Sequence, residues 1–283
     1  MTGKKMREES IDYLRAKAKE IRRTALTMIY HAQSGHPGGS LSAADIVTAL
    51  YFGVMNVDPE KPDWEDRDRF VLSKGHVCPV LYSALIIKGY IGREEIYRLR
   101  KQGSILQGHP DMKKCPGIDI STGSLGQGIS CAVGMAIAAR RDSRKYMTYV
   151  LLGDGECDEG QVWEAAQAAN KYELDNLVVF VDNNRLQNDG FVEDIMPSMD
   201  LRKKFEAFGF EAIRINGHNM EELLSGINTL LASKNGRPKC IVCDTVKGKG
   251  VSFMENVASW HGTAPDEAQY KQAMKELGGG FDE

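Results

Sequence analysis

The 283-residue sequence has no long uncharged hydrophobic run and no leader-like N-terminal segment. A membrane-spanning helix needs about 20 consecutive apolar residues. A secretory leader joins a basic segment to a short hydrophobic one, and the first residues of the chain do not read this way. The sequence therefore predicts a cytoplasmic protein that does not insert into a membrane.

A strong excess of charge is also lacking. The formal net charge is -3, and the 36 basic and 39 acidic residues are spread along the chain. Proteins that bind nucleic acid usually gather basic residues into a patch that follows the phosphate backbone. The sequence therefore predicts no nucleic-acid partner.

Cysteines are few and scattered. A chain of this length can bury a core large enough to fold without disulfides, so the six cysteines are expected to be reduced thiols. Cys240 and Cys243 form a CxxC pattern within the apolar run CIVC. Residues i and i+3 of a strand face opposite sides of a sheet, which argues against a shared redox or zinc site.

Extended and helical segments alternate along the chain, with no linker or repeat between them. This alternation predicts one α/β domain with a doubly wound, mainly parallel sheet and helices on both faces. We expect residues 103–123 to be mostly loop and the final GGGFDE to be frayed. The predicted strands are residues 69–72, 146–152, 177–181, 211–215 and 239–245. The predicted helices are residues 10–33, 42–54, 79–89, 93–101, 126–139, 161–172, about 200–208, and 220–233.

Polar clusters follow two neighbouring predicted strands, GDG at Gly153 and DNN at Asp182. Ligands of parallel sheets bind at the carboxyl ends of strands, so both clusters should lie on the same rim. Asp154 supplies a carboxylate and Asn184 an amide oxygen, which suit Mg²⁺ or Ca²⁺ if diphosphate oxygens complete the coordination. Either cluster alone would more simply be a polar turn after a buried strand. Walker and GxGxxG motifs, which mark ordinary nucleotide sites, are lacking.

Seven motifs carry a resemblance to a known family. In order along the chain they are SGHPGG at Ser34, RDRFVLSKGH at Arg67, GHPD at Gly108, STGSLGQGIS at Ser121, GDG at Gly153, DNN at Asp182 and WHGTAP at Trp260. Over nearly its whole length the chain resembles the N-terminal, diphosphate-binding half of transketolase. The resemblance implies a thiamine diphosphate-binding fold, with thiamine diphosphate and Mg²⁺ (or Ca²⁺) as cofactors. It also implies transfer of a two-carbon ketol unit from a ketose phosphate to an aldose phosphate.

Four of the six histidines fall inside these motifs: His36, His76, His109 and His261. A neutral imidazole donates at one nitrogen and accepts at the other, which suits a polyhydroxylated ligand and proton relay. The resemblance implies that these four line the channel to the cofactor's thiazolium and are catalytic. A single loop histidine would more simply be structural, and we expect this role for His31 and His218, which lie outside the motifs.

The resemblance assigns further site residues. Gly123 and Leu125 should pack against the cofactor, and Glu159 should belong to a buried acidic network near a partner interface. Alternatively, Glu159 is a helix N-terminal charge. Leu186 should offer its backbone carbonyl to the metal. The implied metal ligands are Asp154, Asn184 and Leu186. The implied cofactor-binding residues are His76, Gly123, Leu125, Gly153, Asp154, Gly155, Glu159, Asn184 and His261.

Two residues depart from the family pattern. Ser124 stands where many members have proline, and Lys74 stands in the SKGH motif where asparagine is common. Both leave the histidines and the metal pair intact, so they bear on substrate detail more than on chemistry.

Transketolases hold the cofactor's aminopyrimidine in a second domain and carry a third one, and residues 1–283 correspond to the first domain alone. We expect a natural subunit of a split enzyme, whose partner chain supplies the pyrimidine-binding and C-terminal domains in an α2β2 complex. The sugar substrates stay open, as does the alternative that the sequence is a fragment. The alternative functions are a role in another thiamine enzyme, similar to deoxyxylulose-phosphate synthase or a 2-oxo acid dehydrogenase, and non-catalytic cofactor binding.

Overall fold

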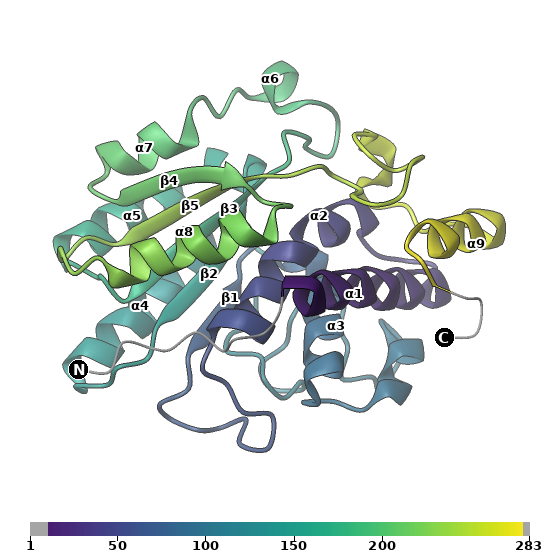
Figure 1. The fold of residues 1–283 in the computed structure, drawn as a ribbon, viewed down its shortest axis with the longest axis horizontal. Coiled ribbons are helices and arrows are strands. Elements are labelled where there is room, and N and C mark those ends of the chain that lie inside the picture. The colour runs from purple at the N-terminus through teal and green to yellow at the C-terminus, as the bar shows by residue number, and fades with distance from the viewer. Residues whose placement is uncertain (1–10, 280–283) are drawn as a thin grey trace.

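A computed structural model describes residues 11–279 and shows a five-stranded sheet between two layers of helices (Figure 1). The strand order is β1-β2-β3-β5-β4, and every neighbouring pair is parallel. The predicted doubly wound parallel fold is therefore confirmed. The strands are β1 (Arg69–Leu72), β2 (Thr148–Gly153), β3 (Leu177–Asn183), β4 (Glu211–Asn216) and β5 (Lys239–Asp244).

Most predicted helices form within a few residues of their expected bounds. The α-helices are α1 (Ile11–Ala32), α2 (Pro37–Thr48), α3 (Cys78–Lys88), α4 (Gln127–Arg141), α5 (Gly160–Lys171), α6 (Val192–Ile195), α7 (Leu201–Ala207), α8 (Met220–Ala232) and α9 (Glu267–Glu276). Shorter helical turns are η1 (Ala49–Val54), η2 (Gly75–Val77), η3 (Arg93–Arg98), η4 (Gly155–Asp158) and η5 (Ala258–His261). Position 10 of the first predicted helix and positions 280–283 of GGGFDE lie outside the described residues.

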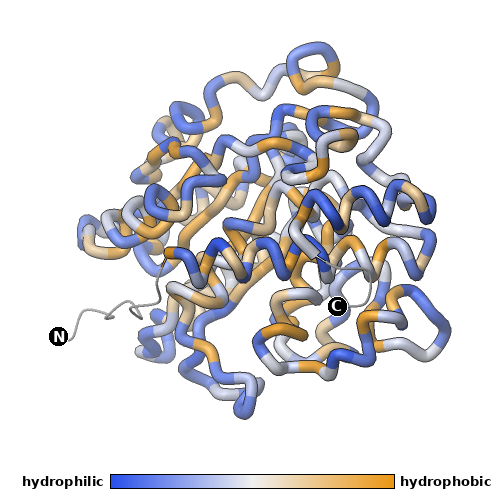
Figure 2. Tube along the Cα trace, turned by 45° about the vertical axis from the view of Figure 1, so that its right-hand side comes forward, coloured by the Kyte–Doolittle hydropathy of each residue, from blue (hydrophilic) through white to orange (hydrophobic). Residues whose placement is uncertain are grey.

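Each face of the sheet has its own hydrophobic core, because alternate strand residues point to opposite sides. Phe180 of β3 packs with α1, α2, α3 and α8, whereas its neighbours Val179 and Val181 pack with α4, α5 and α7. Figure 2 shows the apolar strands in the middle of the molecule. Burial on both faces explains why the inner strands β2, β3 and β5 read as largely continuous apolar runs in the sequence, whereas the edge strand β4 is partly exposed.

The structure corrects two predicted helices. The helix expected from Ser42 begins at Pro37, inside SGHPGG, because proline suits the first turn, where its missing N–H costs nothing. Every residue of α2 is buried, so its sequence lacks the alternation of polar and apolar faces that would show where the helix begins. The segment expected as a charged helix at residues 93–101 forms only the short 3-10 turn η3, whose Ile96 packs against the core but is only partly buried.

The CxxC cysteines lie on opposite faces of β5. Cys240 belongs to the core beneath α4 and α5, and Cys243 to the core beneath α1 and α8. All six cysteines are unpaired. The two thiols therefore cannot share a metal or a disulfide without breaking the strand. Within residues 11–279, none of the helices combines the length and apolar character that crossing a bilayer requires.

Candidate functional site

The GDG and DNN clusters lie side by side at the carboxyl end of the sheet. Gly153 of β2 is in register with Asp182 of β3, and the Asp154 amide donates to the Asp182 carbonyl at 3.3 Å. Each strand ends here, which exposes its following residues to a cavity of about 350 Å³. The rule that parallel sheets bind ligands at this rim therefore locates the site.

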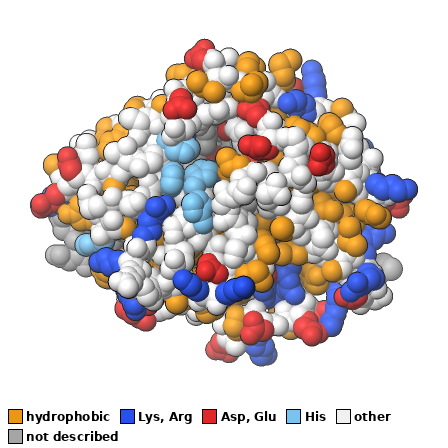
Figure 3. Space-filling model, turned by 180° about the vertical axis from the view of Figure 1, so that it is seen from behind, with side chains coloured by type: hydrophobic (Ala, Val, Ile, Leu, Met, Phe, Trp, Pro, Cys, Tyr) orange, Lys and Arg blue, Asp and Glu red, His pale blue; other side chains and the backbone are white. Residues whose placement is uncertain are grey.

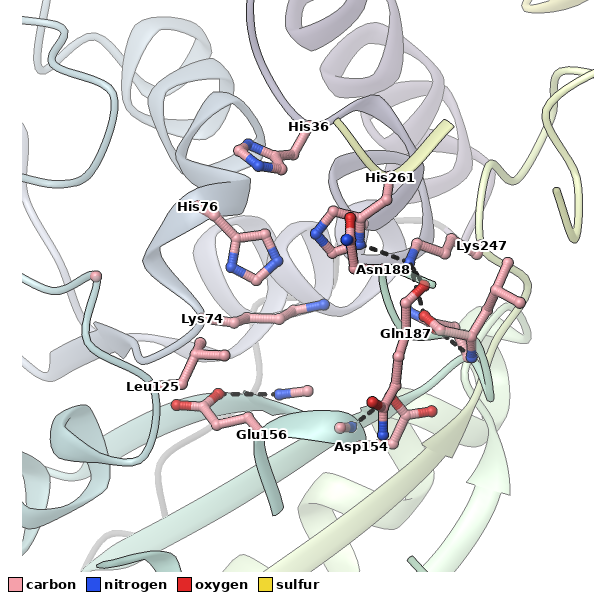
Figure 4. A pocket seen from close by; sticks show the side chains of 16 residues that line it. His36, Lys74, His76, Leu125, Asp154, Glu156, Gln187, Asn188, Lys247 and His261 are labelled. Carbon is pink, nitrogen blue, oxygen red and sulfur yellow. Dashed lines mark hydrogen bonds between the residues drawn. The ribbon is translucent and has the colours of Figure 1, made fainter. Parts of the chain in front are cut away.

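Most of the predicted site residues meet in this cavity (Figure 4). The predicted residues that line it are His36, His76, Gly123, Leu125, Gly153, Asp154, Gly155, Asn184, Leu186 and His261. His109 and Glu159 are not among the lining residues. The lining residues absent from the predicted set are Gly39, Lys74, Glu156, Gln187, Asn188 and Lys247.

Three oxygen-bearing groups, Asp154, Asn184 and Leu186, share one wall of the cavity. The Asp154 carboxylate is buried and accepts the Gly155 amide at 2.8 Å and the Arg185 amide. Burial, followed by the nearby Asp182 charge, raises the pKa of Asp154 to about 6. Among the described residues, no three histidine, cysteine or acidic side chains gather as a metal site. A cation here would therefore need oxygens from a ligand as well.

Two buried lysines bring positive charge to the cavity. The Lys74 ammonium forms an ion pair with Asp182. Lys247 donates to the carbonyls of Leu186 at 2.6 Å and Gln187 at 3.0 Å, and its Nζ lies 2.8 Å from His261 Nδ1. Burial, followed by the charge of Lys74, lowers the pKa of Lys247 to about 8. Buried cations beside hard oxygen ligands suit an anion bound with a divalent metal.

Asp182 is fully buried and contacts the cavity through the lining residue Lys74. Its buried carboxylate accepts the Ser42 hydroxyl at 2.5 Å and the Thr245 hydroxyl, besides pairing with Lys74. Burial alone would raise its pKa, but the Lys74 charge and these hydrogen bonds bring the pKa below its ordinary value. Because its oxygens are already engaged, Asp182 holds neighbouring groups in place, and Asp154 is the carboxylate available to a cation.

Three histidine rings cluster above the lysines. The ring centroids of His36, His76 and His261 are 5.0 to 5.3 Å apart. Figure 4 shows Lys74 between these rings and the acidic end of the cavity, and Figure 3 shows histidines gathered on one face of the molecule. Burial lowers the three pKa values to about 4, 2 and 3, with further lowering by Arg100, Lys74 and Lys247 respectively. The rings are therefore neutral at physiological pH.

His109 lies next to the cavity without lining it. Its ring packs against Gly123, where a β-carbon would come within 3.0 Å of His109 Cδ2. Gly123 also has a φ of +154°, which disfavours a β-carbon. Gly155 allows a similar approach, since a β-carbon there would lie 3.0 Å from Gln187 Cγ. Because these glycines have no β-carbon, the side chains of His109 and Gln187 can approach the backbone closely beside the cavity.

The buried acid near GDG is Glu156, and within this chain Glu159 is exposed. Glu156 accepts the Ser73 hydroxyl at 2.5 Å and the amides of Gly126 at 2.9 Å and Gly153 at 3.1 Å. It therefore ties three motifs together. Glu159 occupies the N-cap position of α5, which fits the alternative of a charge at a helix N-terminus.

The two remaining histidines lie away from the cavity. His31 is exposed and contacts the rings of Tyr30 and Tyr97. His218 is half-buried and hydrogen-bonded to Asp45 and the Val246 amide.

Comparison with known proteins identifies the family. Residues 14–283 match the family described as transketolase, thiamine diphosphate binding domain. The chain is 44% identical to one of the apulose-4-phosphate transketolase subunits of Phocaeicola vulgatus, over 94% of both chains. It is also 44% identical to the 6-deoxy-6-sulfo-D-fructose transketolase subunit SqwG of a Clostridium strain, over 96% of this chain and 98% of that one. Human transketolase is 39% identical over 95% of this chain and 43% of its own length.

Solved structures agree with the sequence relatives. The fold matches transketolase from Campylobacter jejuni with a TM-score of 0.91 and 34% identity, covering 96% of this chain and 43% of that one. Transketolase from Leishmania mexicana matches with the same TM-score and 33% identity, over 95% and 42% of the two chains. The chain thus spans less than half the length of these transketolases. By sequence and by fold, it belongs to the transketolase family, and residues 14–283 carry the family's thiamine diphosphate-binding domain.

Proposed function

We propose that this chain is the diphosphate-binding subunit of a two-chain transketolase. With a second subunit, it transfers a two-carbon ketol unit from a ketose phosphate to an aldose phosphate. One observation carries this proposal. A single cavity combines a buried Asp154–Asn184–Leu186 oxygen set, two buried lysines and a cluster of neutral histidines. The oxygen set and the lysines suit a metal diphosphate, and the histidines suit a sugar.

The residues present fit thiamine diphosphate with a divalent metal. Asp154, Asn184 and the Leu186 carbonyl would hold Mg²⁺ or Ca²⁺, both of which prefer oxygen ligands. Lys74 and Lys247 would offset the charge of the diphosphate. The cofactor, when bound, supplies the electron sink for breaking and forming the carbon–carbon bond. The chain itself binds and orients the cofactor and keeps water from its buried end.

The histidines suit a role in substrate binding. As neutral rings they donate one hydrogen bond and accept another, which matches the hydroxyl and carbonyl groups of a sugar. His36 Nδ1 is buried and has no hydrogen-bond partner among the described residues, so it is available to a ligand. His36, His76 and His261 would orient the substrate and stabilise charge that develops on its oxygen atoms.

The proposal includes a partner subunit. Three relatives that match almost end to end are named as subunits of transketolases, whereas human transketolase is more than twice as long as this chain. We infer a partner that carries the pyrimidine-binding domain and assembles as two copies of each chain, because closed two-fold assemblies are common. A cytoplasmic location is part of the proposal, and the six unpaired cysteines support it.

Kinetics of the reconstituted enzyme tests the role of the histidines. We expect His76→Ala and His261→Ala to lower turnover by about 100-fold, and to weaken cofactor affinity far less, because their contacts form with the reacting substrate. His31→Ala, outside the cavity, should behave as wild type. If both cavity variants lost activity only in proportion to a lower thermal midpoint, the histidines would be structural. Sugar-phosphate transfer and pyruvate decarboxylation assays would distinguish transketolase from other thiamine enzymes.

A further inference from the structure

A chain of hydrogen bonds lies behind the cavity wall, outside the lining residues. Arg22 of α1 pairs with Asp45 of α2, with Nη2 and Oδ2 2.5 Å apart. The same Asp45 oxygen lies 2.7 Å from Nδ1 of His218, in the loop between β4 and α8. The backbone amide of Val246 then meets His218 Nε2 at 2.8 Å. These contacts connect two helices to the segment that follows β5.

The hydrogen bonds define how the His218 ring is protonated. A backbone N–H can only donate, so His218 Nε2 accepts from Val246. The proton of the neutral ring is then on Nδ1, where it donates to the Asp45 carboxylate. Asp45 is buried and also bound by Arg22, so the carboxylate is fixed and orients the ring.

The segment that His218 holds carries Lys247, which lines the cavity, and Thr245, which supports the buried Asp182 beside it. Thr245 donates its hydroxyl to Asp182, the partner of Lys74. Lys247 contacts the Leu186 carbonyl and His261. Val246 lies between these two residues, in a stretch outside regular structure that continues into Gly248 at a φ of +81°. The hydrogen bond from the Val246 amide to His218 therefore anchors the backbone between Thr245, which contacts Asp182, and Lys247, which lines the cavity.

We propose that His218 is a positioning residue of the cofactor site. The ring fixes residues 245–247, so that Lys247 and Thr245 stay aligned with Leu186, His261 and Asp182. This inference rests on the proposed function, because it takes the cavity to be the cofactor site. A histidine that served only the fold would contribute to stability without changing the affinity of the cavity.

Two variants separate the bonds of the ring. In His218→Gln the side-chain amide can reach the Nε2 position and accept from Val246. In His218→Asn it can occupy the Nδ1 position and donate to Asp45 only. For the full chain with its partner subunit, we expect His218→Asn to weaken Mg²⁺-dependent thiamine diphosphate binding about tenfold, as loss of a supporting hydrogen bond does at metal sites. His218→Gln should stay much closer to wild type, and His31→Asn serves as the matched control.

Amide hydrogen exchange of the cofactor-free chain gives a second readout. Residues 245–247 should exchange faster in His218→Asn than in wild type, and His218→Gln should restore most of the protection. Equal cofactor affinity in wild type and both variants, or exchange that is unchanged in His218→Asn, would overturn the proposal. Absence of thiamine diphosphate binding in the wild-type complex would instead refute the proposed function.

Discussion

Asp154 is the residue on which metal binding should depend most. It lines the cavity, and its oxygens are not committed to a lysine, as those of the buried Asp182 are, or to joining three motifs, as those of Glu156 are. We expect Asp154→Asn, which keeps the shape of the side chain, to weaken metal-dependent thiamine diphosphate binding at least about 100-fold because a metal ligand loses its charge. Calorimetric titration measures this loss.

The matched control for this variant is Glu164→Gln, an exposed acid on α5 outside the cavity motifs. It should bind the cofactor as wild type does. Wild-type affinity in Asp154→Asn would show that the metal is held elsewhere.

The cavity histidines should stay neutral over the physiological pH range. Burial lowers the pKa of His76 to about 2 and that of His261 to about 3, while an unfolded histidine titrates near 6.5. The unfolded chain therefore takes up protons first, and the stability associated with these neutral rings falls as pH drops below about 6.5. We expect NMR shifts of both rings to remain constant from pH 8 to pH 5. A titration midpoint close to 6.5 would contradict the buried environment.

Of the lining residues, the sequence predicted the polar groups after β2 and β3 and three of the four motif histidines, His36, His76 and His261. It did not predict Lys247 and Glu156 as lining residues. Lys247 stands in KGKG, which reads as a solvated, charged turn, and only contacts with Leu186 and Gln187, some 60 positions away, show that it is buried. Glu156 and Glu159 are both acids close to GDG, and the sequence does not indicate which one turns inward.

Strand β5 allows a test at the scale of one element. Cys240 and Cys243 are fully buried on its two faces, and burial raises the pKa of both thiols well above the ordinary value. Of the six cysteines, only Cys131 of α4 is partly exposed. We expect one thiol per native chain to react quickly with a thiol reagent, and all six to react in denaturant.

Cys131→Ser is the control for that reaction, and it should abolish the fast phase. Fast modification of Cys240 or Cys243 in the native chain would contradict the packing of β5. Quick reaction of two thiols followed by a disulfide would revive the CxxC interpretation.

The inner strands β2, β3 and β5 were the most predictable elements, because burial on both faces leaves apolar runs in the sequence. Helical turns such as η2 and η4 were not predicted, since they form in loops closed by distant contacts, such as that of Glu156 with Gly126. Helix α9 was not among the predicted helices, although Asp266 and Gln269 form a capping box at its start that can be read in the sequence.

At the scale of the whole molecule, the cavity lies at the carboxyl ends of the parallel strands. Helices cover both faces of the sheet, and the cavity lies where β2, β3 and β5 end. Alternation of strands and helices sufficed to predict this architecture, because parallel strands need crossover helices that pack on the sheet. The proposed assembly with a second chain does not follow from this alternation, because it depends on the exposed surface of the chain and not on its core.

The most direct test of the central claim measures ketol transfer from a ketose phosphate to an aldose phosphate by this chain, by its partner chain, and by their mixture. In the proposed complex, this chain holds the diphosphate end of the cofactor and the partner subunit contacts the remainder. We predict little or no transfer by either chain alone and full activity in the mixture, with light scattering showing two copies of each chain. Full activity from the isolated 283-residue chain would contradict the account.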